Sequence, residues 1–191
     1  MTTTGTAASA PRRWWTGALA VGGCLLLAVR PALVAYTQRP VTTLMLVFVA
    51  LGCVGLVATL PVPERARSAS LTTATASVVG IAAFALGRFT AGGRAPGAWS
   101  IAIVAANMLA AAVEEVWFRR LWFGLLEPVG SAYAVIGSAV LFAAVHVAIY
   151  GVRILPLDIA AGLLFGWQRA TTGSWRAPAL THAAANILVL L

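Results

Sequence analysis

Charged side chains are scarce in this sequence, which contains no lysine and only five acidic residues among its 191 positions. Charged residues make up 9% of the chain, whereas an average soluble domain contains about 25%. So few charges cannot cover the surface of a soluble protein, and this excludes an ordinary globular domain. The 61% hydrophobic composition instead indicates a chain embedded in a lipid bilayer.

Cysteine is scarce and clusters of basic residues are lacking, and each of these features excludes a class of protein. Cys24 and Cys53 lie far apart inside apolar runs, so no disulfide framework or zinc ribbon is predicted, and both thiols are expected to be buried as small hydrophobes. The 13 arginines give a net charge of +8. They are spread over the ends of apolar segments rather than gathered on one face, which favours interfacial anchors over a nucleic-acid surface.

Seven apolar runs dominate the sequence and predict membrane-spanning helices. A helix satisfies its own backbone hydrogen bonds in lipid, and the alternating ten-residue strands of a β-barrel are absent from the pattern. The fold class predicted is an all-α, polytopic bundle of about seven transmembrane helices. Residues 1–13 are expected to be a disordered polar N-terminus, and 14–191 a single transmembrane domain. The runs cover residues 14–36, 40–61, 71–88, 98–126, 131–151, 155–171 and 175–191.

The ends of these runs are marked by helix-breaking residues and by arginines. Proline, glycine and arginine predict loops over 62–70 and 89–97, and Arg30-Pro31 is expected to shorten or break the first helix. If each run crosses the membrane, eight arginines lie on the side of the N-terminus and five on the other side, or seven and five when Arg119 is left out. Because arginine is more frequent on the cytoplasmic side, this count favours a cytoplasmic N-terminus. The lysine-free, arginine-rich composition is typical of a bacterial chain from a GC-rich genome, and we expect a multi-pass protein of the cell (plasma) membrane.

Four ionisable residues lie deep inside the apolar runs: Glu114, Glu115, His146 and His182. Placing such a group in a membrane helix costs at least about 2.5–3.5 kcal/mol, so its presence suggests a function. In the sequence EEVWFR, Glu115 and Arg119 are four residues apart and can form an ion pair, whereas Glu114 points about 100° away. This pairing would leave Glu114 available for chemistry.

The two histidines also have partners one helical turn away. Phe142 precedes His146 by four residues, and Asn186 follows His182 by four. Each cluster alone has a structural explanation, as an ion pair at a helix end, a packed neutral histidine or an interhelical hydrogen bond. Together, three helices that each present a polar face favour a small wet cavity between them.

The order of these motifs, EExxxR, FxxxH and HxxxN, resembles the CAAX protease and bacteriocin-processing (CPBP, or Abi) family, which includes the Ras-converting CAAX endopeptidase. The segment from AAGLLFGW to HAAANI is also similar to that family's linker between its last motifs, and the likeness covers about residues 97–191, the expected catalytic core. The resemblance implies an intramembrane endopeptidase, called a metalloprotease, with a membrane-associated peptide or protein as substrate. The matching residues are Glu114, Glu115, Arg119, Phe142, His146, His182 and Asn186.

Two mechanisms for peptide hydrolysis are compatible with these residues. In the first, Glu114 is the general base that activates water with help from His146, while His182 and Asn186 bind the carbonyl and its oxyanion. In the second, Glu114, His146 and His182 hold a catalytic zinc ion with an open position for water. In both, Glu115 and Arg119 would order the helix. No serine or cysteine lies among the motifs to act as a nucleophile.

Functions of other classes remain open at this point. A non-catalytic membrane protein, such as a bacteriocin self-immunity protein or a scaffold, could have the same fold. A haem protein could use His146 and His182 as ligands, but this would not explain Glu114-Glu115. A transporter would be expected to show an internal repeat, and the sequence has none. A bacterial endopeptidase of this kind would trim a membrane-bound peptide or protein tail.

Overall fold

The structure is a computed structural model that describes residues 14–62, 70–90 and 100–190. All of its regular elements are helical, as the sequence predicts. Residues 1–13 and most of the two predicted loops lie outside the described residues. The elements are α1 (Trp14–Ala35), α2 (Pro40–Thr59), α3 (Ser70–Thr90), α4 (Ile101–Glu115), the π-helical segment η2 (Val116–Trp122), α5 (Phe123–Leu126), α6 (Ser131–Tyr150), the 3₁₀ turn η3 (Val152–Ile154), α7 (Leu155–Thr172) and α8 (Arg176–Leu190).

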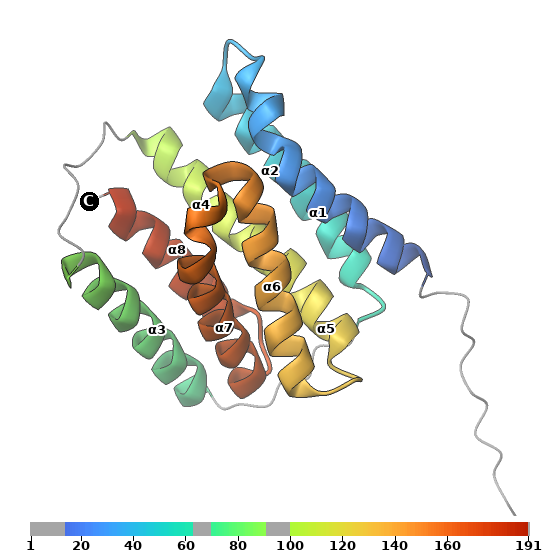
Figure 1. Ribbon diagram of the computed structural model, residues 1–191, viewed down its shortest axis with the longest axis vertical. Helices are drawn as coiled ribbons and strands as arrows, with labels where there is room; N and C mark the ends of the chain where they lie inside the picture. Colours follow the sequence, from blue (N-terminus) through green and yellow to red (C-terminus); the bar gives the residue numbers. More distant parts are fainter. Residues whose placement is uncertain (1–13, 63–69, 91–99, 191) are drawn as a thin grey trace, which may run out of the picture.

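The helices form one bundle in which consecutive rods alternate in direction, with α4, η2 and α5 making up a single rod (Figure 1). α1 and α2 lie together at one side, and α3 lies at the opposite side beside α7 and α8. The rod formed by α4, η2 and α5 runs through the middle, where it contacts α2, α6 and α8. This central rod contains Glu114 and Glu115, and its position explains why both carboxylates are buried.

Five rods are long and apolar enough to cross a membrane, by length and composition. Among the described residues, α7 and α8 do not meet these criteria. α8 has 15 residues and measures about 22 Å, shorter than the hydrocarbon core of about 30 Å. α7 buries Asp158, Gln168 and Arg169 against its neighbours. The chain is a multi-pass membrane protein, and its candidate spans are Trp14–Ala35, Pro40–Thr59, Thr72–Thr90, Ile101–Leu126 and Ser131–Tyr150.

The first helix differs from the prediction at Arg30 and Pro31. α1 continues through both residues to Ala35. Proline removes one backbone hydrogen bond, but membrane helices tolerate this where neighbouring helices support them, and α1 packs along α2 and α6. The predicted break is therefore wrong.

A π-helical segment interrupts the central rod directly after Glu115. Such a segment inserts an extra residue into a helical turn, so that later side chains are rotated relative to a continuous α-helix, and it is frequent at functional sites. Here it places Trp117, Phe118 and Arg119 in the interior, where each is completely buried. Hydrophobic periodicity alone gave no sign of this segment.

Close approach between α6 and α7 depends on a glycine. A Cβ atom added at Gly162 would lie 2.9 Å from the Cα atom of Ala139, so a larger residue would require the two backbones to separate.

The cysteines are placed differently from the prediction. Cys24 is half-buried and accepts a hydrogen bond from Trp122 Nε1 at 3.1 Å, but Cys53 is exposed on α2. Lipid tails are as apolar as a protein interior, so a small apolar side chain on a spanning helix needs no protein cover. The prediction of burial is wrong for Cys53.

Candidate active site

Glu114 lies at the inner end of a cavity of about 270 Å³ enclosed by α1, α2, α4, α6 and α8. Its side chain is almost fully buried, whereas Tyr150, which also lines the cavity, is 63% exposed. The cavity therefore leads from the surface of the bundle to a buried carboxylate. Its polar and charged lining residues are Arg30, Asn107, Glu114, His146, Tyr150, His182 and Asn186.

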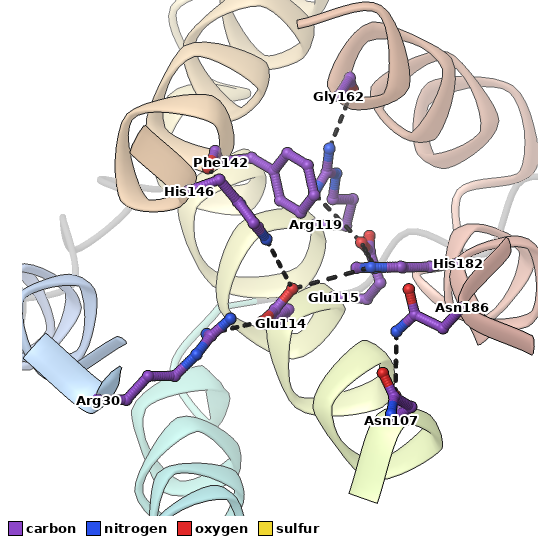
Figure 2. Close-up of polar contacts among 10 residues, drawn as sticks. All are labelled: Arg30, Asn107, Glu114, Glu115, Arg119, Phe142, His146, Gly162, His182 and Asn186. Carbon is purple, nitrogen blue, oxygen red and sulfur yellow. Dashed lines mark hydrogen bonds and ion pairs between the residues drawn. The ribbon is translucent and has the colours of Figure 1, made fainter. Parts of the chain in front are cut away.

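Three side chains from three different helices surround the Glu114 carboxylate (Figure 2). Arg30 Nη1 of α1 lies 2.8 Å from Glu114 Oε1. On the other oxygen, Glu114 Oε2 lies 3.6 Å from His146 Nε2 of α6 and 3.8 Å from His182 Nε2 of α8. Both histidine distances are too long for a direct hydrogen bond.

The second nitrogen of each histidine is held by an acceptor. His146 Nδ1 lies 2.8 Å from the carbonyl oxygen of Phe142, which can only accept, so this nitrogen carries the proton. His182 Nδ1 lies 2.9 Å from Glu115 Oε1 and donates to it in the same way. In the neutral rings, both Nε2 atoms are therefore proton acceptors directed at Glu114.

Aromatic rings fix the orientation of these histidines. Phe142 packs against His146 with ring centroids 4.3 Å apart, and Tyr150 stacks on the same imidazole at 5.8 Å. Phe165 stacks on His182 at 5.0 Å. The sequence motif FxxxH thus has a physical meaning, because Phe142 supplies both a packing surface and the carbonyl that determines the tautomer of His146.

Glu115 forms a separate ion-pair network on the core side of the central rod. Arg119 Nη1 lies 3.2 Å from Glu115 Oε1, and this confirms the pairing expected from the i,i+4 spacing. Arg119 Nη2 donates to the carbonyl oxygen of Gly162 on α7 at 3.0 Å, and its guanidinium lies over the Phe142 ring at 4.7 Å. Because His182 is bound to the same Glu115 oxygen, this network also positions the active-site histidine.

Asn186 lies in the cavity one turn beyond His182, as the spacing predicts. Its Nδ2 donates to the backbone carbonyl of Asn107 on α4 at 3.1 Å. The structure therefore brings all six sequence-predicted site residues to one region, four of them at the cavity and Glu115 and Arg119 behind it.

Sequence reasoning missed Arg30, because it treated the arginines as interfacial anchors. Arg30 is 8% exposed and Arg119 is fully buried, so both are parts of the interior rather than the interface. A buried arginine needs a carboxylate partner, and the site contains two. The signal available in the sequence was the position of Arg30 inside an apolar run.

The predicted zinc ligands Glu114, His146 and His182 lie together but do not fit a metal centre as they are placed. The acceptors on both Nδ1 atoms are of the kind that metal-ligating histidines have. However, the Arg30 guanidinium, itself a cation, already contacts Glu114. Within residues 14–62, 70–90 and 100–190, no group of three histidine, cysteine or acidic side chains is arranged to hold a metal ion. Zinc binding stays a prediction.

Comparison with known proteins shows a likeness to one family over part of the chain. Residues 95–188 match the family model described as type II CAAX prenyl endopeptidase Rce1-like. Searches of curated proteins and of solved structures gave no match. The matched segment contains all three motifs and extends from the residues before α4 into α8. Over residues 95–188, which are 94 of its 191 residues, the chain is similar to the type II CAAX prenyl endopeptidase Rce1-like family.

Proposed function

We propose that this chain is an intramembrane endopeptidase that hydrolyses a peptide bond of a membrane-associated peptide or protein with an activated water molecule. The observation that carries the proposal is the buried Glu114 carboxylate at the end of a cavity, with the Nε2 atoms of His146 and His182 directed at its Oε2. The match to an endopeptidase family supports the same activity.

Direct attack by water suits the groups that line the cavity. Among the described lining residues there is no serine, threonine or cysteine that could form a covalent intermediate. A carboxylate and a neutral imidazole nitrogen are both proton acceptors, and together they can hold a water molecule and polarise it. Glu114 is therefore the proposed general base, and His146 is proposed to assist it.

The reaction then proceeds in two steps. The water oxygen forms a bond to the scissile carbonyl carbon as Glu114 accepts the water proton, and the carbonyl π electrons move onto the oxygen. In the second step the carbon–oxygen double bond reforms, the carbon–nitrogen bond breaks, and the proton held by Glu114 passes to the leaving nitrogen. Asn186 lines the same cavity and is proposed to donate a hydrogen bond to the substrate carbonyl, and His182 is proposed to join it when its Nε2 carries a proton.

Substrate and location follow from the position of the cavity inside a membrane bundle. The cavity is lined by spanning helices and reaches the surface at Tyr150, the last residue of α6, so we propose a membrane-anchored peptide or protein tail. We further propose that the chain works in the plasma membrane of a bacterium, where trimming of membrane-bound peptides fits better than removal of prenylated tails.

The geometry disfavours a haem protein. A porphyrin between His146 and His182 would occupy the position of the Glu114 carboxylate, whose Oε2 lies within 3.8 Å of both Nε2 atoms. A non-catalytic immunity or scaffold protein would need no such carboxylate, and this difference gives the experiment its main variant.

The test is cleavage of a panel of membrane-anchored peptides by the purified full chain in lipid vesicles. Glu114→Gln and His146→Ala are expected to lose cleavage by at least about 10²-fold, since each removes one proton acceptor from the attacking water. Glu127→Gln is the matched control, because Glu127 lies at the end of α5, outside the cavity. Each protein is assayed with and without a chelator, to test for a bound metal.

The outcomes separate the candidate functions. Cleavage by the parent and by Glu127→Gln, but not by the other two variants, would support the proposed enzyme. Equal cleavage by Glu114→Gln and the parent would refute this assignment of the base. A parent that cleaves no peptide of the panel would favour the non-catalytic immunity or scaffold function.

A further inference from the structure

Arg30 is the one charged residue of α1 among those described, and it lies outside the family-matched segment 95–188 and outside the three motifs. It is 8% exposed and lines the cavity beside Glu114. A charge in a spanning helix costs at least about 2.5–3.5 kcal/mol, which favours a function for it.

The contacts of Arg30 hold its guanidinium in place but do not occupy all of its N–H donors. Nη1 forms an ion pair with Glu114 Oε1 at 2.8 Å. The guanidinium carbon lies 5.0 Å from the centroid of the Phe48 ring. Within the described part of the chain, no protein group accepts a hydrogen bond from Nε or Nη2. Arginine carries five N–H donors, so several remain available to a ligand in the cavity.

The other cavity residues offer fewer donors. His182 uses its Nδ1 hydrogen on Glu115, and its neutral Nε2 can only accept. Asn186 uses one Nδ2 hydrogen on the carbonyl of Asn107 and keeps one. Hydrolysis nevertheless requires strong donors at the carbonyl oxygen, because this oxygen gains a negative charge in the transition state.

We propose that Arg30 is a further catalytic residue that donates hydrogen bonds to the scissile carbonyl oxygen as it becomes an oxyanion. This inference rests on the proposed function. The carbonyl would lie between the water on Glu114 Oε2 and the unused Arg30 donors, since Arg30 contacts the other oxygen of the same carboxylate. As the water oxygen bonds to the carbonyl carbon, Arg30 would balance the charge on the oxygen until the carbon–nitrogen bond breaks.

The experiment compares transition-state and ground-state binding in Arg30 variants of the full chain in lipid. A peptide cleaved by the parent is remade with a phosphinate in place of the scissile amide, to mimic the charged intermediate, and with an uncharged ketomethylene, which keeps the carbonyl, as the ground-state mimic. The variants are Arg30→Gln and Arg30→Lys. Arg153→Gln, at an exposed arginine of η3, is the matched control. Thermal unfolding of each variant checks the fold.

We expect Arg30→Gln to lower kcat by about 10²–10³-fold with little change in KM, as for other donors to an oxyanion. Phosphinate affinity should fall in parallel, while affinity for the ketomethylene peptide stays within about threefold. Arg30→Lys should recover part of both losses, because it keeps a cationic donor. If Arg30→Gln does not fold, Arg30→Lys is judged by the same ratio of phosphinate to ketomethylene affinity.

Two results would overturn the inference, and they differ from failure of the proposed function. If the parent cleaves peptides and Arg30→Gln cleaves them within threefold of the parent rate, Arg30 does not contact the oxyanion. Equal losses of phosphinate and ketomethylene affinity would make Arg30 a structural residue only. A parent that neither cleaves the panel nor binds any phosphinate made on its peptides would refute the proposed function, and this inference with it.

Discussion

Replacing Arg119 should lower the free energy of unfolding far more than replacing an exposed arginine. Arg119→Met leaves Glu115 buried with His182 as its remaining hydrogen-bond partner, and it also removes the donor to the Gly162 carbonyl. Breaking a buried ion pair from one side costs about 3–5 kcal/mol. Glu115 Oε2 already has no hydrogen-bond partner among the described residues, so no second contact can compensate. We therefore expect a loss of at least about 3 kcal/mol in the free energy of unfolding.

The double variant Glu115→Leu/Arg119→Met provides the decisive comparison. Each single variant leaves an uncompensated charge in the core, whereas the double variant leaves none. Replacing both members of a buried pair by apolar residues is often nearly neutral, so the double variant should be less destabilised than either single variant. It should still be inactive, because His182 has lost the carboxylate that holds its Nδ1.

The assay is unfolding by sodium dodecyl sulfate in mixed micelles, followed by tryptophan fluorescence. Arg153→Met, at an exposed arginine, is the control and should stay within about 0.5 kcal/mol of the parent. The reasoning is refuted if Arg119→Met also unfolds within about 1 kcal/mol of the parent, or if the double variant loses as much stability as the two single variants combined.

Three further substitutions test the packing that holds the site, by the same unfolding assay. Gly162→Ala should cost about 1–3 kcal/mol, because its Cβ would meet the Ala139 backbone at 2.9 Å; an unchanged midpoint would contradict this close approach. Trp117→Phe should cost about 1–3 kcal/mol, since it removes the buried hydrogen bond of 3.2 Å from Trp117 Nε1 to the Leu51 carbonyl. A smaller loss would indicate that Trp117 contributes only apolar packing. Gly23→Ala would place a Cβ against the Trp117 indole, so it should destabilise the parent more than the Trp117→Phe background.

The positions of the helices could be predicted from the sequence because apolar runs and breakers act locally. The predicted run 40–61 became Pro40–Thr59, and the run 131–151 became Ser131–Tyr150. In each case a proline or glycine next to the run determines where the helix begins or ends. The pairing of Glu115 with Arg119 was predictable for the same reason, as a contact one turn apart on one helix.

Contacts between distant segments could not be predicted in this way. Arg30 and Glu114 are separated by 84 positions, and no local pattern joins them. The hydrogen bond between His182 and Glu115 depends on how α8 packs against α4, and the π-helical segment η2 depends on the packing around the central rod. These features follow from tertiary structure, which brings buried charges of opposite sign together wherever the bundle allows it.

The two adjacent glutamates show how one helix can separate chemistry from support. Successive residues of a helix point about 100° apart, so Glu114 faces the cavity while Glu115 faces the core. Glu115 is bound by Arg119 from its own rod and by His182, and it is sealed from the cavity, which makes it a fixed acceptor. Glu114 has one oxygen at Arg30 and the other directed at two imidazole nitrogens that can accept protons. Two identical carboxyl groups thus have different roles because their partners differ. Glu115 fixes His182, and His182 in turn faces the Glu114 carboxylate in the cavity.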